Sequence, residues 1–438
     1  MNIKNSDFLV GIAKENITPE LGCLLYGYPF ERRAERVLDA LTVGVVAIRQ
    51  GEEMLLMIST DLCALNVGKC TEMRHEIASA TGVKWENILY STIHTHSGPV
   101  TRTNAGWGDA DLEYINDILV PKSIKAANEA LSSLRPAVMG IGISKTMTGI
   151  NRRQIDENGD VILGQNPNGP YDPTMTLISF KTLTGENIGS IAHFAAHPTA
   201  AARNLSFTRD WPGYIVDKVE ELTNAPCIYF NGAEGDVGPR LSNGRTAGGE
   251  EYIMEAGLIA AADIEKAYNN INGYEVPKLN IGYGNILLPF VEPPSRECVE
   301  EQIAEFEKDP DDIKGVKSSQ YDQLKKVRAV YEAGDEFPCS RDVYQTIVAL
   351  GELVIVPACF EVFCAIALKL RELSPYKYTI LLGLTGGTLG YLPTEDQIPF
   401  GGYEVDTFRA IGVVSLVDDT DKRLINQNVE ILKSMYSE

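Results

Sequence analysis

The sequence lacks any apolar run long enough to cross a membrane. Its longest uninterrupted apolar stretches, such as residues 353–357 and 380–384, fall far short of the roughly 20 residues that a transmembrane helix needs. The N-terminal segment, residues 1–20, also has no apolar core followed by a small-residue cleavage site, which a secretory signal peptide would show. We therefore expect a cytoplasmic protein without an integral membrane segment.

Positive charge is also scarce. The 438 residues include 39 lysines and arginines against 60 aspartates and glutamates, which gives a formal net charge of -21 at pH 7. A field of this sign repels nucleic acids and anionic membrane surfaces, because both are negatively charged. The composition therefore excludes nucleic acid as a partner.

Several short motifs with known chemistry are missing. There is no C-x-x-C pair, no H-E-x-x-H and no G-x-S-x-G, which excludes zinc ribbons, zincins and serine hydrolases with a nucleophile elbow. The glycine-rich stretch at 383–390 lacks the lysine of a phosphate-binding loop. The eight cysteines are scattered along the chain, which is typical of reduced, mostly buried thiols in a cytoplasmic protein.

Short β-rich runs alternate with amphipathic stretches through most of the chain. Runs rich in β-branched residues predict strands, and apolar residues three and four apart predict helices. Their alternation predicts an α/β fold in which mixed β-sheets are flanked by helices. The expected strands are 42–49, 53–60, 87–93, 137–146, 175–181, 188–195, 227–231, 281–288, 343–349, 353–356 and 379–384, and the expected helices are 67–81, 111–133, 212–222, 250–269 and 421–435.

One segment, residues 290–337, differs from the rest in its density of charge. Opposite charges recur in it at helical spacing, and Asp309-Pro310 interrupts the pattern. A helix whose charged faces are solvated does not belong to a core. We therefore expect two helices here, forming a surface insertion or lid.

Histidine is rare, yet four of the five histidines fall in two short segments. STIHTHSGP carries His94 and His96 two residues apart, so on an extended strand both side chains point to one face. IAHFAAHPT carries His193 and His197 four residues apart, the second of them just before a proline that ends a strand. Neutral imidazoles so placed can share a divalent ion, although a single histidine is more often a core or surface group.

A carboxylate joins these candidates. Glu361 follows the buried strand LVIVP at the point where a helix is expected to begin. There it either binds a metal or complements the helix dipole. Two histidines with one carboxylate are the ligand set of catalytic zinc sites that leave a position open for water.

Two further segments are predicted as functional loops. In NGAEGDVGPR, residues 231–240, glycines permit tight turns, and Asp236 either orients a ligand histidine or closes an Asx turn. In NRRQ, residues 151–154, Arg152 or Arg153 either binds an oxyanion or forms a surface ion pair.

The order and spacing of several motifs resemble the catalytic domain of the neutral, non-lysosomal ceramidase family. These motifs are VGIAKENITP near the N-terminus with a following GY, STD at 59–61, HTHSGP at 94–99, NR at 151–152, HPT at 197–199, RDWPGY at 209–214, GDVGP at 235–239, GYLPTEDQ near 390 and YEV at 403–405. The resemblance covers about residues 8–410. It implies one large catalytic domain over 1–438, with the site at strand ends and without the C-terminal immunoglobulin-like domain of typical ceramidases.

The resemblance also implies a zinc ion and the residues around it. That family hydrolyses the amide bond of ceramides, and the implied metal ligands are His94, His197, Glu361 and Tyr403. His96 would be a catalytic histidine beside the metal, and Arg152 would assist in the pocket. Zinc lowers the pKa of bound water to roughly 7, which makes hydroxide available to attack a polarised carbonyl.

The loop at 235–240 departs from the family pattern. The family has a serine close to the metal where this chain has Gly238, and Pro239 and Arg240 follow. A hydroxyl that would contact the substrate is therefore missing. Arg240 adds positive charge, which would suit a substrate bearing a carboxylate or another anion.

These observations lead to two functional hypotheses. The first is a zinc-dependent hydrolase that cleaves the amide, or an ester, of a small N-acyl substrate more soluble than ceramide, because so acidic a protein is poorly suited to an anionic membrane. The second is a non-catalytic homologue that binds metal or ligand and has lost turnover together with the serine. A structural metal site in an unrelated α/β protein is a third reading. The sequence leaves the acyl chain, the oligomeric state and the choice among divalent ions open.

Overall fold

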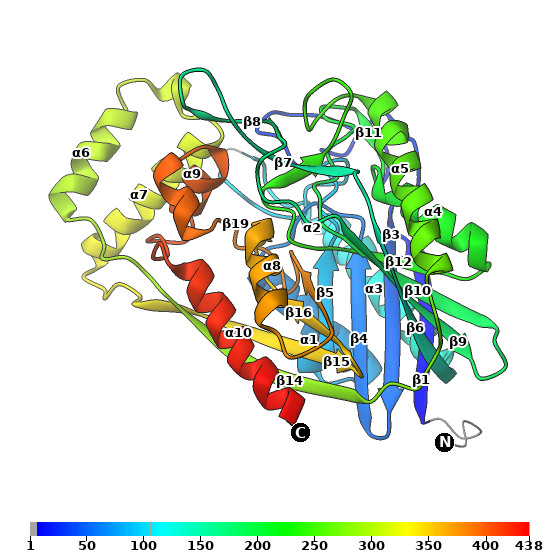
Figure 1. The fold of residues 1–438 in the computed structure, drawn as a ribbon. Coiled ribbons are helices and arrows are strands. Elements are labelled where there is room, and N and C mark those ends of the chain that lie inside the picture. The colour runs from blue at the N-terminus through cyan, green and yellow to red at the C-terminus, as the bar shows by residue number, and fades with distance from the viewer. Residues whose placement is uncertain (1–6, 106, 438) are drawn as a thin grey trace.

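The computed structural model describes residues 7–105 and 107–437. Two β-sheets form the centre of the molecule, and helices cover their outer faces (Figure 1). The larger sheet has eight strands, in the order β12 (Cys227–Asn231), β10 (Asn187–Phe194), β9 (Thr174–Thr182), β6 (Arg135–Lys145), β1 (Phe8–Asn16), β3 (Thr42–Gln50), β4 (Glu53–Thr60) and β5 (Ile88–Thr92). The smaller sheet has four strands, in the order β14 (Leu279–Pro289), β15 (Ser340–Leu350), β16 (Leu353–Pro357) and β18 (Tyr378–Leu382).

Three short sheets lie beside these two. They are β11 (Ser206–Phe207) with β2 (Arg36–Val37), β13 (Val237–Pro239) with β7 (Gly149–Ile155) and β8 (Val161–Asn166), and β17 (Glu361–Val362) with β19 (Tyr391–Leu392). Both main sheets are mixed, because parallel pairs such as β10 with β12 and β16 with β18 occur among antiparallel ones. The predicted α/β class with mixed sheets flanked by helices is therefore confirmed.

The helices form the two outer layers. α1 (Val67–Thr81) and α3 (Val120–Ser132) cover one half of the larger sheet, and α4 (Pro212–Thr223) and α5 (Glu250–Asn269) cover the other. The smaller sheet is covered by α8 (Cys364–Leu373) and α10 (Thr420–Ser437). The remaining helices are α2 (Leu112–Tyr114), α6 (Arg296–Phe306), α7 (Val316–Ala333) and α9 (Tyr403–Arg409). None of the helices in the described ranges is both long and apolar enough to cross a membrane.

The two main sheets pack face to face on a shared apolar layer. Met57 and Phe230 of the larger sheet and Ile355 and Ile380 of the smaller sheet belong to one buried cluster, and none of them is more than 4% exposed. Burial of one such side chain stabilises the fold by about 1.5–3 kcal/mol. This layer holds the strand ends of both sheets in fixed relation, which positions the loops that follow them.

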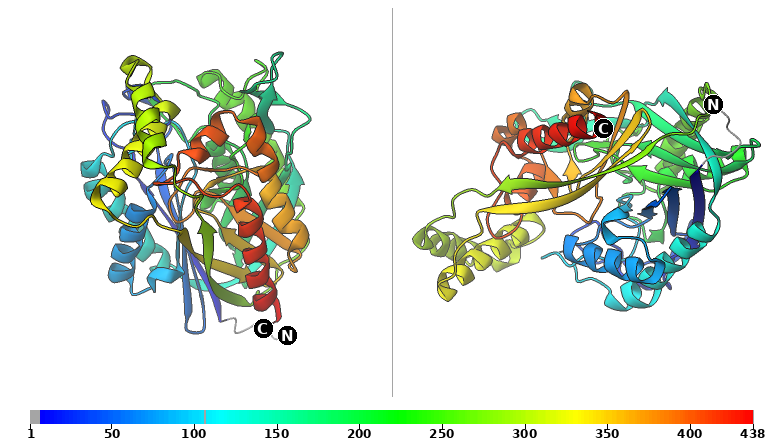
Figure 2. Two further views of the ribbon diagram at one scale, coloured as in Figure 1. Left: turned by 90° about the vertical axis from the view of Figure 1, so that its left-hand side faces the viewer. Right: turned by 90° about the horizontal axis from the view of Figure 1, so that it is seen from below.

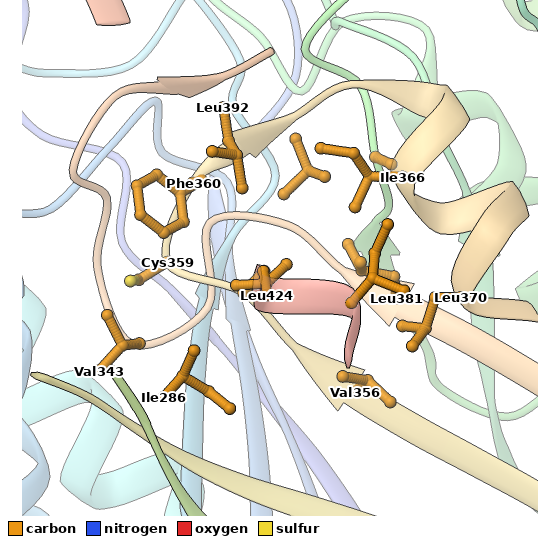
Figure 3. Packing of buried hydrophobic residues seen from close by; sticks show 14 of the residues in the cluster. Ile286, Val343, Val356, Cys359, Phe360, Ile366, Leu370, Leu381, Leu392 and Leu424 are labelled. Carbon is orange, nitrogen blue, oxygen red and sulfur yellow. The ribbon is translucent and has the colours of Figure 1, made fainter. Parts of the chain in front are cut away.

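A second apolar core lies between the smaller sheet and its helices. Figure 3 shows Val356 near Leu370 of α8 and Leu424 of α10, with Phe360 and Leu392 at one side of the cluster. Phe360 and Leu392 are fully buried. Phe360 precedes β17 and Leu392 lies in β19, so packing fixes the backbone of both strands of this short sheet.

Most of the predicted strands and helices are present, but two predicted segments differ, and strands β1 and β8 were not predicted. Residues 151–154, predicted as a loop, lie within strand β7. The single helix predicted at 111–133 is interrupted: a π-helical turn at Ile115–Leu119 separates α2 from α3. Pro121 explains the interruption, because it has no N–H to donate to the preceding turn.

The charged segment at 290–337 does contain two helices, α6 and α7, as predicted. It is inserted between β14 and β15 and projects beyond the ends of these two strands (Figures 1 and 2). A small apolar cluster holds the pair together and attaches it to Val414; it includes Val299 and Ile303 of α6 and Leu324 and Val327 of α7.

Candidate metal centre

The two histidine segments meet because the larger sheet curls back on itself. Its edge strand β12 returns to β4, where Ser59 Oγ donates a hydrogen bond to the carbonyl of Tyr229 (2.6 Å). At the end of β12, the Asn231 side-chain amide donates to the carbonyls of Ile93 (2.9 Å) and Ala196 (3.2 Å). Asn231 therefore ties the loop after β5 to the loop after β10.

His94 lies in the loop after β5. The sequence analysis had placed it on an extended strand, which is wrong. Strand β5 ends at Thr92, and His94 has a positive φ of 72°, which is rare for a residue other than glycine. Its backbone N–H donates to the carbonyl of Leu62 (2.9 Å), and its ring Nδ1 donates to the carbonyl of Cys63 (2.9 Å). The carbonyl fixes the tautomer, so the lone pair of the neutral ring lies on Nε2.

His197 is held in the same manner. It lies just beyond the end of β10 and is fully buried. Its Nδ1 donates to the carbonyl of Glu234 (2.7 Å), which again leaves the lone pair on Nε2.

Glu361 completes the group from the other side of the molecule. It is the first residue of β17, opposite Tyr391 of β19. Its Oε2 lies 3.2 Å from His94 Nε2 and 3.4 Å from His197 Nε2, and the three ligand atoms lie within 4.8 Å of one another. Gly235 is required behind it, since a Cβ there would lie 2.5 Å from the Glu361 carbonyl oxygen.

These three residues fit a divalent cation by their chemistry. Two imidazole lone pairs and a carboxylate oxygen converge, and Glu361 Oε2 has no hydrogen-bond donor although it is buried. Buried acceptors that face one another repel unless a positive charge lies between them. Nitrogen and carboxylate ligands of this kind are those that zinc prefers. Cys63, His94 and His96 form a second possible group, which shares His94 with the first.

The pKa values of Glu361 and His94 also indicate that positive charge is stabilised at this site. Burial alone would raise the pKa of Glu361, but the neighbouring histidines His94 and His197 hold it well below its usual value. Burial alone would lower the pKa of His94, yet Cys63 and Glu361 raise it well above its usual value. Burial and Arg152 lower the pKa of His197 to about 3, so this ring is neutral.

His96 lies beside the three residues. Its Nε2 is 3.2 Å from His94 Nε2, and its Nδ1 is buried without a hydrogen-bond partner. The pKa of His96 is held well below its usual value, chiefly by burial and next by the positive charge of His94. The ring packs on Gly27, which has a φ of 107° and where a Cβ would lie 2.5 Å from the imidazole. Only glycine fits this approach.

Arg152 projects from β7 into a buried polar network and makes no surface ion pair. Its Nε donates to Glu404 Oε1 (2.8 Å), and its Nη2 donates to the hydroxyl of Tyr391 (2.8 Å). That hydroxyl lies 3.2 Å from His197 Nε2. Arg153 binds the other oxygen of Glu404 (2.8 Å). The pair of arginines therefore holds Glu404, and Arg152 reaches His197 through the hydroxyl of Tyr391.

A pocket of about 240 Å³ opens onto this group. His94, His96 and Glu361 line it together with Tyr391 and Tyr403. Tyr403, the implied fourth ligand, begins α9, and its ring centroid is 5.5 Å from that of Tyr391. Burial and the charge of Glu361 raise the pKa of Tyr403, so its hydroxyl is neutral without a cation.

The loop at 235–240 lies behind the group. Asp236 does not bond to a histidine side chain: its carboxylate accepts from Asn151 Nδ2 (2.9 Å) and from the Cys364 N–H (2.6 Å). Gly238 and Arg240 are not among the described residues that line the pocket. A side chain at position 238 would collide with Thr246, because a Cβ built on Gly238 would lie 2.5 Å from the Thr246 Cβ.

His193 does not join the cluster, although the sequence pattern grouped it with His197. It lies within β10, and its Nε2 donates to the carbonyl of Leu381 (3.0 Å) in the smaller sheet. Burial lowers the pKa of His193 to about 4. It is a neutral core histidine that links the two sheets.

Four residues of the site were not singled out in the sequence, although Asn231 and Glu234 lie in the predicted functional loop 231–240. Tyr391 and Glu404 lie inside motifs used for the family resemblance, but only the fold brings them to Arg152. Asn231 lies at the end of a predicted strand, a position where a polar residue was a usable clue. Glu234 is fully buried, neither carboxylate oxygen has a partner, and burial raises its pKa to about 8.

Comparison with known proteins places this arrangement in a known fold. No family model matches the chain. The crystal structure of neutral ceramidase from Pseudomonas aeruginosa has a TM-score of 0.74 to this structure at 16% sequence identity, covering 99% of this chain and 75% of that chain. A ceramidase complexed with C2 has a TM-score of 0.74 at 15% identity, covering 99% of this chain and 76% of that chain. The resemblance that the motifs predicted is thus confirmed at the level of the fold: this chain has the fold of neutral ceramidase.

Proposed function

We propose that this protein is a zinc-dependent hydrolase that cleaves the amide bond, or an ester, of a small N-acyl substrate. The two structural neighbours are named as ceramidases, enzymes that act on a lipid amide. The observation that carries the proposal is the convergence of His94 Nε2, His197 Nε2 and Glu361 Oε2 in a buried position at the end of a pocket. Tyr403 is the proposed fourth ligand.

The ion and the chain have separate tasks in this proposal. A bound divalent ion lowers the pKa of water and polarises the carbonyl oxygen of the substrate. The carbonyls of Cys63 and Glu234 hold both ligand histidines in the tautomer that leaves Nε2 free. Glu361 supplies the negative charge.

His96 is the proposed acid-base group. Its low pKa keeps the ring neutral at pH 7, so one of its nitrogens has a lone pair that can take a proton and later return it to the leaving amine. Arg152 and Tyr391 are hydrogen-bond donors near His197. Donors fixed in a buried network can stabilise negative charge on the carbonyl oxygen without reorganising.

The size of the pocket argues for a short substrate. Pockets that bury drug-sized ligands measure about 300–1,000 Å³. The pocket of about 240 Å³ is smaller than these, whereas a ceramide carries two long hydrocarbon chains. We therefore expect an N-acyl compound with a short acyl group to be a better substrate than ceramide.

The test measures metal content and activity in the same preparations. Purified protein is analysed for zinc with and without chelator, and release of free acid is measured from N-acyl compounds of increasing chain length, ceramide included. His197→Ala is expected to lose bound zinc and turnover together. His193→Ala is the matched control, because it removes a buried histidine of the same segment that is not a proposed ligand.

Two results would contradict the proposal. Zinc retained at full stoichiometry in both His94→Ala and His197→Ala would reject the ligand set. Zinc bound by the wild type with no cleavage of any amide or ester in the series would favour the non-catalytic homologue.

A further inference from the structure

The pocket contains positive charge that the proposed chemistry does not use. Arg102 and Lys326 both line it. Glu361 is the one carboxylate among the described lining residues, and its charge belongs to the proposed metal group. In a protein with a net charge of -21, a pocket with two cations and no free carboxylate is unusual. The lining therefore carries charge opposite in sign to the net charge of the whole protein.

Arg102 has fewer partners than the buried arginines nearest to the site; Arg32, for example, has no ion pair but donates to the backbone carbonyls of Tyr26 and His96. Arg152 and Arg153 share Glu404, and Arg371 is paired with Asp172. Arg102 is half-buried and its Nε is buried without a hydrogen-bond acceptor. No ion pair within the described ranges includes it. A guanidinium left without an acceptor costs free energy that a bound anion would recover.

Lys326 is a weaker candidate. It lies on α7 and is paired with Asp322 of the same helix at 2.6 Å. Its side chain is also 54% exposed, so water screens its charge. Arg102 is therefore the better anchor, because its fork of donors matches a carboxylate in two parallel hydrogen bonds.

The positive charge predicted from the sequence was Arg240, but the pocket is not lined by it. Arg102 lies in the loop that follows the histidine motif, and Tyr26, Trp107 and Tyr403 line the same pocket. Aromatic walls with one unpaired arginine suit a ligand that is mostly apolar and has a single anionic end.

We propose that Arg102 binds a carboxylate of the substrate, so that the natural substrate is a short anionic N-acyl compound. This inference rests on the proposed hydrolase function and adds the substrate class and the residue that selects it. The carboxylate belongs either to the amine part, as in an N-acyl amino acid, or to the acyl part, as in a monoamide of a dicarboxylic acid. Both sources present the same group to Arg102.

The test compares anionic and neutral compounds in matched pairs. N-butanoylalanine is paired with N-butanoylalanine amide, and N-succinylpropylamine with N-butanoylpropylamine. For the zinc-loaded wild type, kcat/KM is expected to be about tenfold or more higher for the anionic member of one pair, which is the effect of one charge-assisted hydrogen bond. The pair that shows the preference identifies the position of the carboxylate.

Variants assign the preference to a residue. Arg102→Met keeps an unbranched side chain but removes the guanidinium and its charge, and it is expected to bring the ratio close to one through a higher KM for the anionic member. Arg102→Lys should keep part of the preference. Arg240→Met is the comparator, since it removes the arginine that lies outside the pocket. Zinc content and circular dichroism verify that each variant is folded and loaded.

The outcomes separate this inference from the proposed function. Cleavage at equal rates within both pairs would leave the hydrolase intact and overturn the role of Arg102. A preference that survives Arg102→Met and disappears in Arg240→Met would also overturn it. If no compound is cleaved, the proposed function fails, and the same compounds are titrated by calorimetry as ligands. Tighter binding of an anionic member to the wild type but not to Arg102→Met would then still support the anion site, and equal binding would reject it.

Discussion

At the scale of single residues, backbone carbonyls define the candidate site as much as its ligands do. His94 adopts a left-handed conformation because the carbonyls of Leu62 and Cys63 hold its N–H and its ring. Strain of this kind persists only where the surroundings determine it fully. The histidine spacing in the sequence drew attention to His94 and His197, which the fold does bring together, but the strand geometry used to interpret it was wrong for His94, which lies in a loop.

His193 gives a prediction about pH. The folded protein keeps this ring neutral, with its pKa lowered from 6.5 to about 4, whereas the unfolded chain protonates it below pH 6.5. Protons therefore favour the unfolded chain as the pH falls, so His193 contributes stability above pH 6.5 that is lost toward pH 4. His193→Gln should remove this dependence. Between pH 7 and pH 5, the free energy of unfolding of the wild type should fall relative to the variant by about 2 kcal/mol.

Urea denaturation of the metal-free proteins at a series of pH values measures this difference. Using protein without metal avoids the pH-dependent release of an ion, which would change the stability of both proteins. Glutamine keeps a donor for the carbonyl of Leu381, so the comparison isolates the titration. A difference that stays constant from pH 7 to pH 5 would show that His193 is protonated or exposed in the native protein.

Single residues also mark the limit of the sequence prediction. His94 and His197 were proposed from their spacing and their motifs, and Glu361 from its position after the buried strand LVIVP; their role as metal ligands stays a prediction. Arg102 was not proposed from the sequence. The residues next to an arginine in the sequence do not show whether it has a carboxylate partner in the fold. Pairing is decided by long-range contacts such as that of Arg152 with Glu404, 252 positions apart.

At the scale of elements, the α6–α7 pair is an insertion in a β-hairpin. Strands β14 and β15 pair up to Pro289 opposite Ser340, and the Phe290 N–H still donates to the Cys339 carbonyl (2.9 Å). The two ends of the insertion are therefore adjacent. A two-residue Asn-Gly turn can join strands at this point without changing their register.

We predict that replacing residues 291–338 by Asn-Gly gives a folded protein that still binds zinc. None of the proposed ligands lies in the deleted segment, and its small apolar cluster is removed together with it. Exposure of Val414 should lower the free energy of unfolding by about 2 kcal/mol. KM for the best substrate should rise, because Val316, Ser319 and Lys326 of α7 line the pocket.

Three measurements on the shortened protein test this prediction. Zinc analysis tests metal binding, urea denaturation tests the free energy of unfolding, and steady-state kinetics test KM. Loss of zinc would show that the insertion supports the ligand loops. An unchanged KM would show that α7 does not shape the substrate pocket.

The elements that were predicted correctly are those whose pattern is local. Helix α1 was predicted at 67–81 and begins and ends there, because its apolar spacing and the left-handed Gly82 after it act within a few residues. Strand β7 was predicted as a loop, because Asn151, Arg152 and Arg153 form no apolar run. These polar residues are buried in a strand since Asp236 and Glu404 satisfy them from distant parts of the chain.

At the scale of the whole molecule, the proposed metal ligands come from three separate parts of the structure. His94 and His197 follow strands of the larger sheet, and Glu361 lies in a short sheet fixed against the smaller sheet by the core shown in Figure 3. The class of fold was predictable from the alternation of strands and helices. The strand order was not, because the return of β12 to β4 and β5 depends on the curl of the entire sheet.

This arrangement predicts that metal stabilises the fold. An ion bound by both halves of the molecule is released when they separate, and an ion that binds only the folded chain adds about 2.7 kcal/mol to the free energy of unfolding at a free concentration 100 times its Kd. Chelator should therefore lower the melting temperature of the wild type, and zinc should restore it.

Glu361→Gln removes the one anionic ligand of the three, so zinc should stabilise this variant far less. His193→Ala, which lowers stability without touching the ligands, should keep the full zinc effect. Equal melting temperatures of the wild type with zinc and with chelator would mean that His94, His197 and Glu361 hold no ion across the two sheets. A protonated His94 would then supply the positive charge that balances the Glu361 carboxylate.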